Sequence, residues 1–64
     1  MLNSEEWQKR VVAEGVMLCP KCESVDVTFG ACAVGAFTIH QEYVCESCQH
    51  MFKGLFVLTG EYPA

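Results

Sequence analysis

The sequence predicts a small α+β domain stabilised by a bound metal ion, and three observations lead to this prediction. Two cysteine pairs have metal-ligand spacing, a segment near the N-terminus has helical features, and several short segments alternate in polarity. A chain of 64 residues buries too little apolar surface to offset the conformational entropy lost on folding. It therefore needs a disulfide, a metal ion or oligomerisation.

The predicted helix covers residues 3–15. Ser4 can cap its N-terminus, two glutamates lie in the first turn where the helix dipole favours anions, and Gly15 can end it. Trp7 and Val11 are four residues apart and share one face. Because this apolar stripe is too narrow for an independent helix, we expect Trp7 to anchor the helix on the rest of the domain. The alternative is that Trp7 contacts a partner.

The rest of the chain predicts a three-stranded antiparallel sheet. Apolar and polar residues alternate in the first two segments, as in half-buried strands, whereas the third is apolar on both faces. We expect these strands at residues 25–29, 37–44 and 51–58. An apolar last strand needs a cover on each face, which the helix, a partner or a second copy in a homodimer would supply.

We expect a single domain over residues 1–64, with the metal-binding part at residues 16–59 and a tail at residues 60–64. Residues 16–18 are expected to form a further short strand that leads into the first cysteine pair. Residues 30–36 are small, and their two glycines permit the positive φ angles of a turn. This segment is expected to form the loop of the first hairpin.

Four cysteines have the spacing of a metal site. Cys19 and Cys22 form one C-x2-C pair, Cys45 and Cys48 form another, and 22 residues lie between the pairs. Each pair can bind one ion from a tight turn, and two pairs supply a tetrahedral set of thiolates at about 2.3 Å from the ion. A β-hairpin in the intervening segment would return the second pair to the first. We therefore predict one Zn²⁺ per chain, with Cys32 as a small apolar loop residue.

These residues resemble the zinc ribbon family, in which a C-P-x-C knuckle, a β-hairpin, a second C-x-x-C knuckle and a final strand follow in order. Phe52 matches the aromatic residue that comes four positions after the last cysteine. The resemblance covers about residues 18–58 and implies the same four cysteine ligands. It departs from the family at Glu23 and Gln49, where the family usually has glycine. The resemblance is to a small bacterial or phage-type zinc-ribbon protein. Zinc ribbons occur in transcription, replication, ribosomal and phage accessory proteins, so the resemblance implies a fold and not one function.

Two other uses of the cysteines remain open. C-x-x-C pairs also form redox-active disulfides, although such enzymes carry one motif on a larger βαβ scaffold. Four thiolates also suit iron, as in rubredoxins. The second knuckle here, Cys45-Glu46-Ser47-Cys48, lacks the proline and the following glycine that rubredoxins carry.

The charge distribution is acidic. The formal net charge is −4, and four deprotonated thiols around a divalent ion would make it −6. Proteins that bind nucleic acid normally neutralise phosphates with a basic patch. Here the only basic residues are Lys9, Arg10, Lys21 and Lys53, and no charged residue occurs from Val27 to Gln41. Direct nucleic-acid binding would require the four bases to converge on one face.

A cytoplasmic protein is expected. The N-terminus lacks the basic and apolar regions of a secretory signal, and no segment approaches the roughly 20 apolar residues of a membrane span. In a reducing compartment, paired cysteines are more often metal ligands than disulfides.

We expect no enzymatic activity, because an enzyme would need an open metal position or a convergent acid, base and nucleophile, and a closed four-cysteine site leaves no open position. The favoured interpretation is a protein-interaction module, a small regulator or accessory that binds transcription or replication machinery through its apolar hairpin and acidic helix. The alternative is a direct nucleic-acid-binding zinc ribbon, and an iron electron carrier is a minor third. No membrane and no small-molecule substrate are expected.

Overall fold

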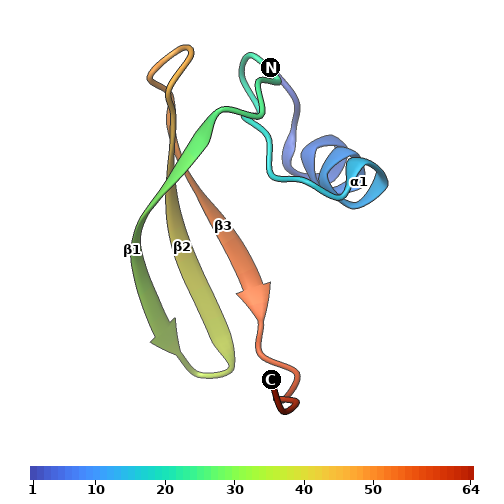
Figure 1. Cartoon of the computed structure of the whole chain (residues 1–64), viewed down its shortest axis with the longest axis vertical. Coiled ribbons are helices and arrows are strands. Elements are labelled where there is room, and N and C mark those ends of the chain that lie inside the picture. Colours follow the sequence, from blue (N-terminus) through green and yellow to red (C-terminus); the bar gives the residue numbers. More distant parts are fainter.

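The computed structural model describes all 64 residues. One helix is followed by three strands: α1 (Ser4–Glu14), β1 (Val27–Gly35), β2 (Thr38–Cys45) and β3 (Met51–Val57). The strands form a single antiparallel sheet in the order β1-β2-β3 (Figure 1). The predicted α+β class, with an N-terminal helix and a three-stranded antiparallel sheet, is confirmed. No helix is long and apolar enough to cross a membrane.

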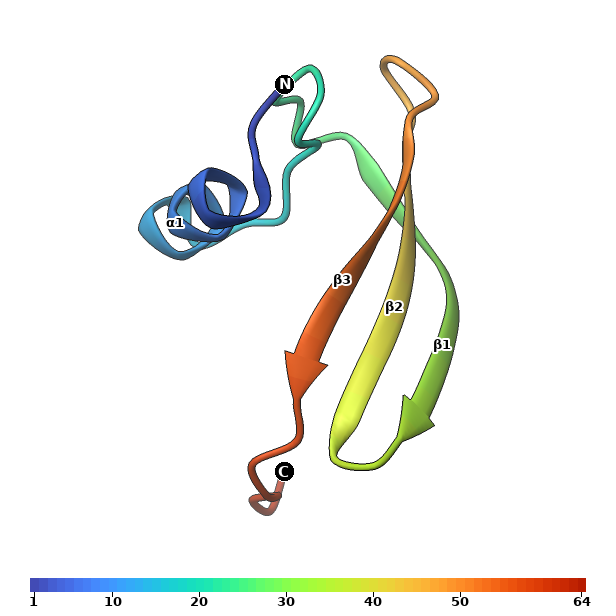
Figure 2. The ribbon, with the colours of Figure 1, turned by 180° about the vertical axis from the view of Figure 1, so that it is seen from behind.

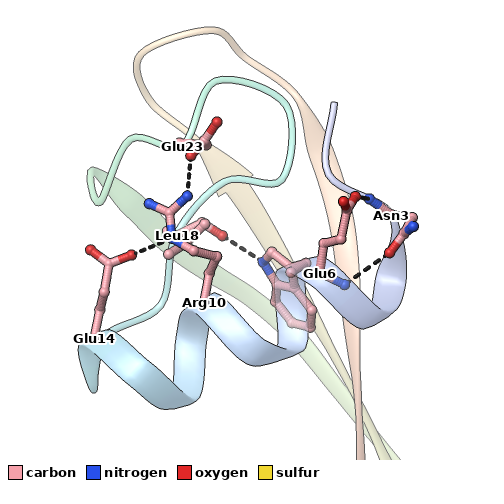
Figure 3. Close-up of polar contacts among 7 residues, drawn as sticks. Asn3, Glu6, Arg10, Glu14, Leu18 and Glu23 are labelled. Atoms are coloured by element: carbon pink, nitrogen blue, oxygen red, sulfur yellow. Dashed lines mark hydrogen bonds and ion pairs between the residues drawn. The ribbon is translucent and has the colours of Figure 1, made fainter.

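The helix begins with a capping box. The Asn3 side chain accepts a hydrogen bond from the Glu6 backbone N–H (2.8 Å), and the Glu6 carboxylate accepts one from the Asn3 backbone N–H (3.0 Å) (Figure 3). The prediction that Ser4 caps the helix is wrong, because the glutamate that completes the box lies three residues after Asn3. The predicted end is confirmed: Gly15 adopts a left-handed conformation (φ 68°), and its N–H donates to the Val11 carbonyl (2.9 Å).

Trp7 anchors the helix, as predicted. Its indole Nε1–H donates to the carbonyl of Leu18 (2.8 Å), and its ring meets Phe52 of β3 edge to face, with centroids 6.0 Å apart. Residues 16–18, predicted as a strand, are irregular. Because the Leu18 carbonyl is taken by Trp7 while its side chain is fully buried, this segment connects helix and knuckle instead of joining the sheet. The helix lies beside the upper part of the sheet, on the β3 side (Figures 1 and 2).

The first hairpin is longer and tighter than predicted. Residues 30–36 were expected to form a loop, but β1 continues to Gly35 and the turn consists of Ala36 and Phe37 alone. Both turn residues have positive φ, at 43° and 71°. Positive φ at both central residues defines a type I′ turn, whose twist matches that of the flanking strands. The prediction that glycines supply the positive φ here is therefore wrong.

A β-bulge explains how the strand continues through its glycine. The pairing register shifts between Phe29 and Cys32, so that two residues of β1 lie opposite Glu42. The side-chain amide of Gln41 donates to the carbonyl of Gly30 (3.0 Å) inside the bulge. Glycine and small residues in this segment thus indicate a local irregularity within a strand, not the end of the strand.

The core is small and lies at the cysteine end of the sheet. Tyr43 stacks on Phe52 (centroids 5.1 Å apart) and meets Phe29 edge to face (5.4 Å), so one aromatic row crosses all three strands. A Cβ atom on Gly54 would lie 2.9 Å from Tyr43 Cε2 and 3.0 Å from Phe56 Cε2. Five of the 64 residues are buried: Leu18, Cys19, Tyr43, Cys45 and Gly54.

The half of the sheet far from the cysteines is uncovered. No other element lies over it in either view (Figures 1 and 2). Six large apolar side chains in this half and directly beside it are exposed: Val34, Phe37, Leu55, Phe56, Val57 and Leu58. The apolar character that the sequence shows for the hairpin and the last strand is therefore mostly displayed on the surface.

Candidate metal centre

Folding brings the four cysteines of the two C-x2-C pairs together. Their Sγ atoms all lie within 4.8 Å of one another. Across the cluster, Cys19 Sγ lies 3.6 Å from Cys48 Sγ, and Cys22 Sγ lies 3.4 Å from Cys45 Sγ. No disulfide is formed, and all cysteines are free. The arrangement in this structure is a cluster of four thiols at one end of the sheet.

The cluster has the dimensions of a tetrahedral metal site. Four sulfur atoms at about 2.3 Å from a central ion lie roughly 3.8 Å from one another. The measured separations of 3.4 Å and 3.6 Å are close to that value, and the spread up to 4.8 Å needs only small side-chain rotations. A single ion fits all four thiolates. The four-cysteine cluster thus indicates a metal-binding module.

The two knuckles have the same backbone structure. Glu23 N–H donates to the Cys19 carbonyl, and Gln49 N–H donates to the Cys45 carbonyl, both at 2.8 Å. Glu23 and Gln49 also share a left-handed conformation, with φ of 63° in each case. These are the two positions at which the sequence departs from the glycine of zinc ribbons. The knuckles form despite this departure, at the conformational cost that a side chain meets in left-handed backbone.

Hydrogen bonds join the two knuckles beside the sulfur cluster. The hydroxyls of Ser24 and Ser47 lie 2.9 Å apart, one from each knuckle. The Glu46 backbone N–H donates to the Asp26 carbonyl (2.8 Å). Sequence reasoning did not single out the serine pair. Its signal was the presence of a serine within two residues of a cysteine in both knuckles.

Two of the clustered thiols, those of Cys22 and Cys45, differ in pKa. Burial raises the pKa of Cys45, but hydrogen bonds from the Cys48 backbone and from the Cys22 thiol lower it by more, to about 7. A backbone hydrogen bond from Ser24 lowers the pKa of Cys22, but its hydrogen bond to Cys45 and its loss of hydration outweigh this and raise the pKa to about 12. In the metal-free cluster, the Cys22 and Cys45 thiols share one proton in a hydrogen bond between Sγ atoms 3.4 Å apart. A metal ion must displace that proton.

Ion pairs connect the helix to the first knuckle, and they involve both basic residues of the helix. Arg10 pairs with Glu14 (2.8 Å) and with Glu23, which follows Cys22 (Figure 3). The hydrogen bond to Glu14, and then that to Glu23, raises the pKa of Arg10. Lys9 pairs with Glu5 (3.2 Å). Two of the four basic side chains thus face carboxylates of the same chain.

The remaining cysteine and histidine near this region lie outside the sulfur cluster. Cys32 is exposed in β1, beyond the bulge, instead of in a loop as predicted. The ring of His50 stacks on Phe52, with centroids 5.9 Å apart and planes at 13°.

The four-cysteine cluster at the end of a three-stranded antiparallel sheet fits a zinc-ribbon-like arrangement. Comparison of the chain with protein-family models, curated proteins and solved structures gave no match.

Proposed function

We propose that this protein is a non-enzymatic protein-interaction module in which Cys19, Cys22, Cys45 and Cys48 hold one structural Zn²⁺. Zinc suits a closed tetrahedral set of four thiolates. Structural zinc contributes about 10 kcal/mol or more to folding, and a chain with five buried residues among 64 has few other sources of stability. The zinc-ribbon-like arrangement favours an accessory or regulator of transcription or replication machinery.

The interaction role is supported mainly by the conformation and exposure of Phe37 at the hairpin tip. Phe37 has φ 71° and is 75% exposed. Left-handed backbone costs a non-glycine residue roughly 1–2 kcal/mol, and an aromatic ring in water recovers none of it. Backbone strain of this kind concentrates at functional sites. The exposed ring at a strained position is therefore best explained by contact with another molecule.

The surroundings of the tip favour an apolar protein surface as its partner. No charged residue occurs between Val27 and Gln41, and Val34, near the tip, is also exposed. Nucleic acid is disfavoured because this region offers no base to a phosphate, while Lys9 and Arg10 are paired with carboxylates. Direct nucleic-acid binding remains the competing hypothesis that the experiment below distinguishes.

The test replaces the turn by the preferred type I′ sequence, with Ala36→Asn and Phe37→Gly together. This variant removes the ring while relieving the strained backbone. Tyr62→Gly is the matched control for loss of an exposed aromatic ring, because Tyr62 is 86% exposed and belongs to the C-terminal tail, not to the hairpin turn. Metal-loaded proteins are used to capture partners from a lysate with and without nuclease, at low and high salt, after elemental analysis for zinc and iron.

We expect one zinc per chain and a protein that survives nuclease, is lost with the turn variant and is retained by Tyr62→Gly. Capture that is unchanged by the turn variant would refute the role of the tip. Recovery of nucleic acid alone, lost at high salt, would favour the competing hypothesis. A coloured protein with one iron per chain would replace the zinc assignment by an iron centre.

A further inference from the structure

One edge of the sheet, on β3, presents an uninterrupted row of unpaired peptide groups. Leu58 N–H donates to the Phe37 carbonyl (2.7 Å) at one end of the β2–β3 ladder, and Cys45 N–H donates to the His50 carbonyl (2.9 Å) at the other. Hydrogen-bonded pairs alternate along an antiparallel ladder, so every second residue of β3 points its peptide groups away from β2. These residues are Met51, Lys53, Leu55 and Val57.

The two edges of the sheet differ. The β1 edge is interrupted by the bulge between Phe29 and Cys32, whereas β3 pairs with β2 without any register shift. Bulges and charged side chains are devices by which proteins protect sheet edges from pairing with other chains. The β3 strand has no bulge, and its one charged residue, Lys53, lies toward the knuckle end of the strand. Its edge is thus competent to pair with a further strand.

A groove runs beside this edge. It measures about 590 Å³ and lies between α1 and β3, with Trp7, Val11, Met17, Phe52 and Phe56 among its mostly apolar lining. The helix stands off from the distal part of β3 in both views (Figures 1 and 2). A strand added to β3 would place the side chains of one of its faces against this apolar lining.

The chain exposes more surface than its mass explains. Its accessible area is 4826 Å² for 7.1 kDa, whereas the scaling for compact monomers gives about 4,100 Å². The excess of roughly 700 Å² is close to the ~800 Å² that each partner contributes to a standard protein interface. An excess of this size is enough to supply one side of such an interface.

Charge and symmetry favour a second copy of this chain as the partner of the β3 edge. Each chain carries −4 overall, so two copies can associate only where carboxylates do not oppose one another. The distal part of β3 and the segment after it, residues 54–60, carry no charge. An antiparallel pair of identical strands is also self-complementary, because each N–H meets a C=O of the same strand across a two-fold axis.

We infer that two copies of this chain join through their β3 edges. The strands pair antiparallel, the two sheets become one six-stranded sheet, and the apolar end of each β3 enters the groove between α1 and β3 of the other copy. The hairpin tips point to opposite ends of this dimer, and Phe37 lies on the β2 side of β3, not at the edge that pairs. The inference does not rest on the function proposed for Phe37.

The test measures the association of the metal-loaded full chain by sedimentation equilibrium from micromolar to millimolar concentration. We expect a monomer–dimer equilibrium that reaches about 14 kDa, twice the chain mass of 7.1 kDa. Leu55→Lys places two like charges at the paired edges and should weaken the dimer at least tenfold. Ala33→Lys is the matched control, because Ala33 lies in the same cross-strand row through His40 but on the opposite edge.

Hydrogen exchange locates the interface without mutation. The amides of Lys53, Leu55 and Val57 should become protected as concentration rises, while those at the β1 edge should not. A single 7.1 kDa species at all concentrations would refute the inference. So would a dimer in which these amides exchange freely, or one that both lysine variants weaken equally, because each result would place the interface elsewhere.

Discussion

Replacement of Gly54 by alanine should destabilise the domain, and the structure gives the size of the effect. The new Cβ would lie 2.9 Å from a ring carbon of Tyr43 and 3.0 Å from one of Phe56. Phe56 is partly exposed and can move. Tyr43 is buried and held between Phe29 and Phe52, so the backbone of β3 must shift instead. Overpacking of this kind costs about 1–3 kcal/mol, and we expect about 2 kcal/mol.

Gly35→Ala is the matched control. Gly35 lies in the same sheet, its φ is not positive, and a Cβ there would have no atom within 4 Å. Alanine at such a site stabilises by roughly 0.4–1 kcal/mol, because it restricts the unfolded chain. Thermal unfolding of both variants, followed by circular dichroism at one fixed zinc concentration, measures the difference.

For a domain of this size, 1 kcal/mol corresponds to about 4–8 °C in Tm. Gly54→Ala should therefore lower Tm by roughly 8–16 °C, while Gly35→Ala should raise it by a few degrees. Equal Tm values for Gly54→Ala and the parent protein would show that the aromatic row does not press on β3. Destabilisation of similar size in both variants would show that any side chain in the sheet has this effect.

Three further predictions concern the metal centre. Cys19→Ser should lose the metal and most of the ordered structure, since the zinc contributes about 10 kcal/mol or more, whereas Cys32→Ser should keep one ion per chain in elemental analysis. Gln49→Gly should raise the unfolding free energy by about 1 kcal/mol, because glycine adopts the left-handed backbone without cost; an unchanged or lower Tm would contradict the strain described for the knuckles. Metal affinity should decrease as the pH is lowered. Cys22, with a pKa of about 12, must release a proton to bind metal at neutral pH, and Cys45 must release a second proton below its pKa of about 7. Chelator competition should show at least a tenfold loss per pH unit above pH 7 and at least 100-fold below it, and a flat profile would refute the proton displacement.

The parts of the fold that the sequence made predictable are those with a strong local signal. The spacing of the four cysteines predicted that they cluster, and they do. The helix ends at Gly15 as predicted, and β2 and β3 lie within one residue of their predicted bounds. Cysteine spacing and alternation of polarity are local features of the sequence, so they predict structure without knowledge of tertiary contacts.

The failures occur where two local signals compete. Small residues and two glycines between 30 and 36 indicated a loop, but pairing with β2 kept them in a strand and moved the turn to Ala36 and Phe37. The expected strand at 16–18 was lost because Trp7 took the Leu18 carbonyl. Asn3 and Ser4 both favour a helix cap, and only the position of Glu6 distinguished them. Each outcome depended on a contact that a one-dimensional pattern does not contain.

The turn at Ala36 and Phe37 is also an unfavourable place for the hairpin to start folding. Hairpins with an Asn-Gly turn can start to fold at the turn. Here the two turn residues resist the required backbone conformation. Closing the 22-residue segment between Cys22 and Cys45 costs about 3 kcal/mol of chain entropy, and a shared metal ion recovers it at once. The strands should therefore assemble from the knuckles toward the tip, and the exposed ring of Phe37 takes its final position last.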